Sequence, residues 1–177
     1  MQIKNFLLLF ICLTVPSINA QNLTSYVNTF VGTKNMGHTF PGATTPFGMV
    51  QLSPETNQEP YAIDGKYNPE TYRYCSGYQY EDHTIFGFSH THFSGTGHSD
   101  LGDFLVMPTV GKLNLEPGKS KEPKSGYHSQ FSKNTEKANP GFYEVFLKDY
   151  GKRNSPPPNA LVFTNIHSRN RRTRILF

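Results

Sequence analysis

The chain has 177 residues, the length of one ordinary domain, and its 36% hydrophobic and 14% aromatic residues are enough to build a core. The formal net charge of +4 belongs to one end, because residues 152–177 carry six Lys or Arg side chains and no acidic one. Residues 21–151 carry 10 basic and 13 acidic side chains, a net charge of −3, which gives no support for a nucleic-acid partner.

Residues 1–20 have the pattern of a secretory signal peptide. Lys4 precedes the ten-residue apolar run Phe6–Val15, and the following "PSINA" ends in a small residue at Ala20. The run is too short to span a bilayer, so we expect no membrane span but cleavage after Ala20 and export to the periplasm or the extracellular space. Cleavage removes Cys12 and leaves Cys75 as the single cysteine, which we expect to be buried and inert.

Beyond the signal peptide, short apolar stretches alternate with glycine and proline, and the 15 glycines and 13 prolines favour turns over helices. The segment 141–150 is the clearest strand, because one set of alternating positions, Tyr143, Val145 and Leu147, is entirely apolar. Residues 54–74 are predicted to be a loop, and residues 116–141 a hairpin or surface excursion outside the core. Further strands are predicted at 48–54, 75–80, 84–94 and 103–115. We therefore expect a mainly β protein, folded as an antiparallel β-sandwich.

The segment "GFSHTHFSGTGHSDLGDF", residues 87–104, concentrates polar and flexible residues. On a strand, His90 and His92 would project to the same face, with Ser94 continuing the row, and Asp100 and Asp103 follow a glycine-rich turn. Three interpretations remain open from the residues alone. The cluster could bond its own backbone, hydrogen-bond the hydroxyls of a sugar, or hold a metal ion. The segment "HTFPGATTPFG", residues 38–48, has the same character.

Three long segments, taken together, resemble the N-terminal part of glycoside hydrolase family 92. They are "FVGTKNMGHTFPGATTPFGMVQLSPET", "YCSGYQYEDHTIFGFSHTHFSGTGHSDLGDFLVMP" and "PGFYEVFLKDYG", and the resemblance covers residues 25–151. Members of this family are exported, calcium-dependent exo-α-mannosidases. The resemblance implies an N-terminal β-sandwich that packs against a larger (α/α)6-barrel domain. It also implies an inverting reaction, with one carboxyl group as general acid and a second activating water.

In that family the catalytic carboxylates and the main calcium ligands come from the barrel, and the sandwich contributes loops to the substrate pocket. The resemblance therefore implies no catalytic residue and no complete calcium site within this chain. It implies an N-terminal fragment of an exported α-mannosidase, of the α-1,2 type, that is inactive alone. The residues we expect to line the mannose pocket are His38, Cys75, His90, His92 and Ser94, with Cys75 as a packing or contact residue and not a nucleophile.

Two other functions remain open, and whether the chain acts as an enzyme is left undecided. The first alternative is a stand-alone carbohydrate-binding β-domain. The second is a half-enzyme that is complemented by a separately encoded barrel. The partners expected in each case are mannose-containing glycans, together with the barrel domain for the enzyme forms.

The resemblance ends after Gly151, where "KRNSPPPNALVFTNIHSRNRRTRILF" replaces the strands expected in the family. Three consecutive prolines do not fit inside a central strand. A one-nucleotide frameshift near the codon for Lys152 explains the change, because residues 159–169 are codon-compatible with "KRVGFHKYTFP" in the neighbouring frame. We therefore expect a signal peptide at 1–20, a partial sandwich at 21–151 that is incomplete at its C-terminal side, and an out-of-frame, basic, Pro-rich tail at 152–177.

Overall fold

The structure is a computed structural model that describes residues 23–44, 48, 50–95, 97, 102, 104–109 and 112–148, together with the backbone of 160–164. The predicted signal peptide and most of the predicted tail lie outside these residues. The described strands are β1 (Ser53–Glu55), β2 (Ala62–Ile63), β3 (Lys66–Tyr67), β4 (Thr84–Ile85), β5 (Gly87–Ser89), β6 (Ser129–Gln130), β7 (Lys137–Asn139), β8 (Phe142–Phe146) and β9 (Ala160–Thr164). Three short 3-10 helices accompany them: η1 (Leu23–Tyr26), η2 (Pro69–Tyr74) and η3 (Lys133–Thr135).

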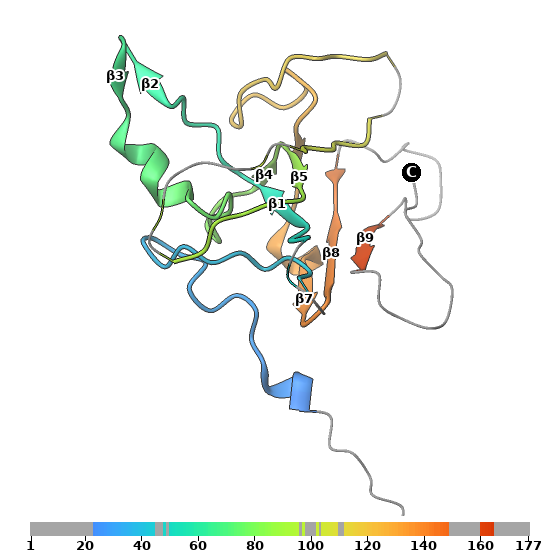
Figure 1. Cartoon of the computed structure of the whole chain (residues 1–177). Coiled ribbons are helices and arrows are strands. Elements are labelled where there is room, and N and C mark those ends of the chain that lie inside the picture. Colours follow the sequence, from blue (N-terminus) through green and yellow to red (C-terminus); the bar gives the residue numbers. More distant parts are fainter. Residues whose placement is uncertain are drawn as a thin grey trace, which may run out of the picture.

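All the strand pairings described are antiparallel, as the sequence predicted. β1 pairs with β5, β4 with β6 and β2 with β3, while β7, β8 and β9 form a three-stranded sheet in that order. Figure 1 shows β7, β8 and β9 beside the central strands β1, β4 and β5. The prediction of a mainly β, antiparallel sandwich is therefore confirmed. Among the described residues, no helix has the length and apolar character needed to cross a bilayer.

The core lies between these sheets and is built mainly from aromatic and branched side chains. Strand β8 alternates as predicted, because Tyr143 and Val145 are buried and Leu147 follows them on the same side. Phe131 belongs to the same cluster, although residues 116–141 were predicted to lie outside the core. That prediction was wrong because the polar composition of the segment concealed a strand, β6, which pairs with β4 and is followed directly by Phe131, itself bridged to Leu147. The core cluster comprises Ile85, Phe88, Phe131, Tyr143, Val145 and Leu147.

The strands are shorter than the sequence indicated. β1 begins only at Ser53, and β5 ends at Ser89 instead of continuing through residue 94. Residues 75–80 form no strand, because Gly77 has a φ of +74° and the amide of Gln79 donates to the hydroxyl of Thr56 instead of to a neighbouring strand. Residues 104–109 pair with the sheet only through the single bridge of Val106 with Phe88.

A hairpin and a helical turn occupy part of the region predicted as a loop, residues 54–74. β2 and β3 are joined by Asp64 and Gly65, which both have positive φ, as a two-residue primed turn requires. Asn68 caps η2, because its side-chain oxygen accepts a hydrogen bond from the amide of Glu70 over 3.1 Å. In Figure 1 this hairpin stands away from the remaining strands.

A buried carboxylate ties several of these elements together. Glu136 accepts hydrogen bonds from the hydroxyls of Tyr78 (2.8 Å) and Tyr143 (2.6 Å) and pairs with Lys133 over 3.0 Å. Burial raises the pKa of Tyr78 and Tyr143 above the ordinary phenol value, and the Glu136 charge adds to the effect. Burial lowers the pKa of Lys133, with Glu136 opposing it.

Candidate functional site

The two glycine-rich loops meet beside strand β1. The amide of Gly95 donates to the carbonyl of His38 over 2.8 Å, which joins the second loop to the first. The amide of Gln51 donates to the carbonyl of His90, also over 2.8 Å. Segments that are about 50 residues apart in the sequence are thus brought into one surface region.

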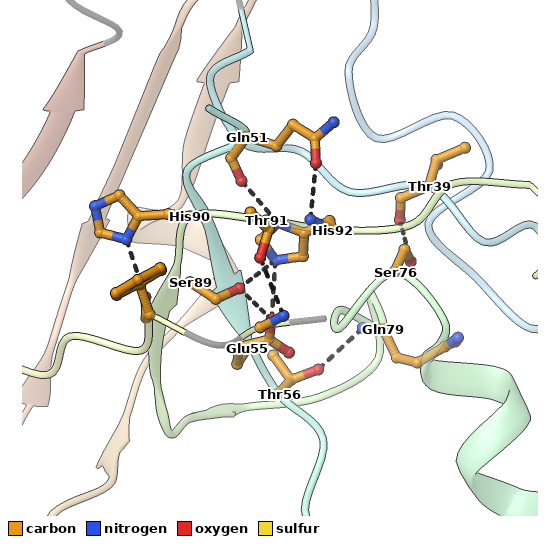
Figure 2. Close-up of polar contacts among 12 residues, drawn as sticks. Thr39, Gln51, Glu55, Thr56, Ser76, Gln79, Ser89, His90, Thr91 and His92 are labelled. Carbon is orange, nitrogen blue, oxygen red and sulfur yellow. Dashed lines mark hydrogen bonds and ion pairs between the residues drawn. The ribbon is translucent and has the colours of Figure 1, made fainter. Parts of the chain in front are cut away.

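His92 is the centre of this region and its side chain is 1% exposed. Its Nδ1 lies 2.7 Å from the carbonyl oxygen of Gln51, and its Nε2 lies 2.9 Å from Oε1 of Glu55 and 2.8 Å from the hydroxyl of Ser89. Its backbone amide donates to the side-chain oxygen of Gln51 over 2.8 Å, and Phe40 from the first loop stacks on its ring at 4.8 Å. Figure 2 shows the polar contacts of Gln51, Glu55 and Ser89 converging on the His92 imidazole.

The partners of His92 determine which of its atoms carry hydrogen. A backbone carbonyl can only accept, so Nδ1 must donate to Gln51. The hydroxyl of Ser89 donates its one hydrogen to Glu55, so it accepts from Nε2. Both ring nitrogens are thus engaged, and Nε2 lies against a carboxylate that is itself only 17% exposed. His92 fixes the loop in place, and its nitrogen atoms are already used.

His90 does not share a face with His92, contrary to the expectation. Because β5 ends at Ser89, the alternation of a strand does not extend to these two residues. The Nδ1 of His90 instead lies 2.9 Å from the carbonyl oxygen of Phe104. In Figure 2 the ring of His90 points away from the group formed by Glu55, Ser89 and His92.

His38 combines three unusual properties. It is 3% exposed, its φ of +50° lies in the left-handed region, and its ring meets that of Tyr72 edge-on at 4.8 Å. Its Nε2 is buried and has no hydrogen-bond partner among the residues that the structure describes. Buried polar atoms without partners are rare in native proteins and indicate a strained site or an absent ligand.

Cys75 and Ser94 differ in their accessibility. Cys75 is 2% exposed, so the expected burial is confirmed, and that burial raises the pKa of its thiol. The hydroxyl of its neighbour Ser76 donates to the carbonyl of Thr39 over 3.0 Å, which ties this segment to the first loop. Ser94 is exposed at the junction with His38 and Gly95.

The described residues do not bring three His, Cys, Asp or Glu side chains close enough together to hold a metal ion. Asp100 and Asp103, which raised the possibility of a metal site, lie outside those residues.

Three residues that hold the site together were not among those predicted. Gln51, Glu55 and Ser89 bind His92 through its backbone and both ring nitrogens. The sequence offered one signal, since Ser89 lies within the segment 87–104 and directly precedes His90. Glu55 gave none, because its contact depends on the antiparallel register that places Ser53 opposite Ser89.

Comparison with known proteins identifies the family of this chain. The model of the glycosyl hydrolase family 92 N-terminal domain matches residues 26–154. A protein of Arthroderma benhamiae described as an uncharacterized secreted glycosidase is 31% identical over 146 residues, which is 80% of this chain and 17% of the relative.

Solved structures agree. The family 92 α-mannosidase from Bacteroides thetaiotaomicron in complex with mannoimidazole is 47% identical, with a TM-score of 0.63, over 74% of this chain and 16% of that one. The family 92 glycosyl hydrolase ccman5 is 32% identical, with a TM-score of 0.55, over 78% of this chain and 16% of that one. The chain therefore spans about a sixth of the length of these relatives. It belongs to glycosyl hydrolase family 92 and matches the N-terminal domain of that family.

Proposed function

We propose that this chain is the N-terminal sandwich of an exported α-mannosidase and that its two glycine-rich loops form one wall of a mannose pocket. The observation that carries the proposal is the junction of the loops at His38, which accepts the amide of Gly95 at its carbonyl and has a buried Nε2 without a partner in the described part of the chain. A sugar hydroxyl both donates and accepts hydrogen bonds, so it is a suitable partner for that nitrogen. The mannoimidazole complex of the Bacteroides relative supports mannose as the sugar.

The five predicted lining residues take different roles in this proposal. His38 and Ser94 are the sugar-contacting candidates, since one has an unpaired buried nitrogen and the other is exposed. His92 is a positioning residue, because Gln51, Glu55 and Ser89 occupy its nitrogens. Cys75 packs beneath the loops, and His90 links its loop to the backbone at Phe104.

The remaining parts of the enzyme belong to the proposed barrel partner. Glycoside inversion needs two carboxyl groups about 6.5–9.5 Å apart, one to protonate the leaving oxygen and one to activate water. Calcium would be held with sugar hydroxyls by oxygen ligands, and the described residues do not form such a cage. We assign both functions to the barrel, and the α-1,2 linkage preference rests on the same family resemblance.

The proposed location is the periplasm or the extracellular space. The signal-like pattern at residues 1–20 supports export, and the Arthroderma relative carries the description "secreted". The proposed partners are mannose-containing glycans and the barrel domain.

Two measurements test the proposal. Titration of the full chain with methyl α-mannoside is expected to show saturable binding that His38→Gln weakens about tenfold. Incubation with an aryl α-mannoside is expected to release no mannose, with or without calcium. Release of mannose by the purified chain would contradict the proposed division of roles. Binding that His38→Gln and Ser94→Ala leave unchanged would place the sugar elsewhere.

A further inference from the structure

A cavity of about 360 Å³ opens beside the end of β1. One part of its lining is a continuous polar segment that includes Glu55, Asn57, Gln58 and Glu59. The other part comes from four separate places along the chain and includes the apolar or aromatic residues Phe86, Leu105, Pro117 and Tyr127. Glu55 and Gly102, which lies in the segment 87–104, are shared with the region described above, whereas the five predicted lining residues His38, Cys75, His90, His92 and Ser94 do not line this cavity.

The polar segment is held in a defined shape. The amide of Thr56 donates to the carbonyl of Gly77 over 2.8 Å. The side-chain oxygen of Asn57 accepts from the amide of Glu59 over 2.8 Å, and that of Gln58 accepts from the amide of Ser120 over 3.0 Å. The side-chain oxygens of both amides are thereby engaged, which leaves their NH2 groups as hydrogen-bond donors toward a ligand. Because these hydrogen bonds already hold the segment in place, a ligand would need to order few side chains on binding.

The lining determines the chemistry of the ligand. Among the residues that the structure describes, the lining has two carboxylates and no Lys, Arg or His, which does not suit a phosphate, a sulfate or another anion. Carboxylates and amides together accept from and donate to hydroxyl groups, while Phe86 and Tyr127 offer apolar surface. A pyranose has both features, hydroxyls around its edge and C–H groups on its faces. The cavity also lies within the size range of small-molecule pockets.

From this lining we infer a second sugar-binding site, one that takes a single neutral hexopyranose unit. Glu55 joins it to the first site, since the same carboxylate lines the cavity and accepts hydrogen bonds from His92 and Ser89. A sugar bound in the cavity therefore contacts the residue that positions the loop of His92. The site itself follows from the lining; only its identity as a site for mannosides rests on the proposed function.

The test is an NMR titration of the isotope-labelled full chain with methyl α-mannoside. The backbone amides of Glu59, Gly118 and Tyr127 report on the cavity, and those of Thr39 and Gly95 report on the loops. Glu59→Leu removes a carboxylate from the cavity, and Leu105→Trp fills it. Glu122→Leu is the matched control, because it removes an exposed carboxylate that pairs with Lys119 outside the cavity.

We expect saturable shifts at the cavity amides, weakened at least fivefold by Glu59→Leu and by Leu105→Trp and unchanged by Glu122→Leu. Shifts at the loop amides alone, or none at either group, would overturn the second site. Shifts of the cavity amides on addition of methylammonium, with no response to the mannoside, would also overturn it and make the cavity a cation site. Shifts at the cavity amides alone would support the second site while contradicting the proposed mannose wall, so the two failures are distinguishable.

Discussion

The Nε2 of His92 lies 2.9 Å from Oε1 of Glu55, and this contact joins the end of β1 to the histidine-rich loop. The pair is shielded from water, since the two side chains are 1% and 17% exposed. It determines where the loop lies, because the carbonyl of Gln51 fixes the opposite side of the same ring. The pair thus fixes the loop that carries Ser94, one of the two proposed sugar-contacting residues.

Replacement of Glu55 by Leu is expected to lower the free energy of unfolding by about 3 kcal/mol, because it leaves the buried Nε2 of His92 and the hydroxyl of Ser89 without their carboxylate partner. Urea denaturation of the full chain measures the change. Glu70→Leu serves as the control, since Glu70 pairs with Arg73 at 3.6 Å on the surface and should cost less than about 1 kcal/mol. Equal losses of unfolding free energy for the two substitutions would show that the buried pair stabilises the fold no more than the surface pair.

The buried tyrosines predict a loss of stability in alkali. The pKa values of Tyr78 and Tyr143 are raised in the folded state, so above about pH 10 the unfolded chain loses protons that the folded chain keeps. The stability these residues contribute is therefore complete below pH 10 and falls as the pH rises above it. Absorbance at 295 nm and circular dichroism should show these phenols ionising only as the fold is lost. Ionisation of all ten tyrosines before unfolding would contradict this.

The Lys133–Glu136 pair predicts strong non-additivity. Glu136→Leu alone is expected to cost about 3–5 kcal/mol, because it leaves the largely buried Lys133 and the hydroxyls of Tyr78 and Tyr143 without their acceptor. The double change Lys133→Met, Glu136→Leu should recover a large part of that loss, since it removes the stranded charge as well. A double-mutant cycle by urea denaturation measures the coupling. Simple additivity of the two single changes would rule out a coupled pair.

His38 allows its backbone and ring contributions to be separated. His38→Gly should be more stable than His38→Ala by about 1 kcal/mol, because a φ of +50° is strained for alanine and not for glycine. Both substitutions remove the ring and should weaken methyl α-mannoside binding to the same extent. Thermal unfolding and calorimetric titration give the two readouts. Retained binding in His38→Gly would exclude a sugar contact by the imidazole.

Residue patterns predicted the fold class and strand β8 well, because alternation along 142–147 reports directly which side chains are buried. They failed where pairing depends on the chain at long range. Phe131 lies in a polar segment and reaches the core only through β6 beside β4. The primed turn at Asp64 and Gly65 is a local signal that favoured a hairpin from the start, yet the surrounding polar residues led to a loop prediction.

The candidate site divides in the same way. The loops rich in glycine and histidine were identified from composition, and the structure joins them through His38 and Gly95. The separate directions of His90 and His92 could not be predicted, because they depend on where β5 ends. The importance of Glu55 likewise follows from the register of β1 against β5, which a single sequence does not encode locally.

The tail supplies the last prediction. The family match ends at residue 154, and the proposal that residues 152–177 are translated out of frame remains a prediction. The pairing of β9 with β8 does not decide it, because a ladder is formed by backbone groups and any extended run can provide it. Both "ALVFT" and its neighbouring-frame counterpart "RVGFH" can extend in this way.

Sequencing the coding DNA from the codon of Tyr150 onward tests the proposal. An adjacent frame that continues into further strands and a helical barrel would support it. Stop codons in both other frames, with no family-like text after them, would make the short chain genuine and favour a stand-alone sugar-binding domain.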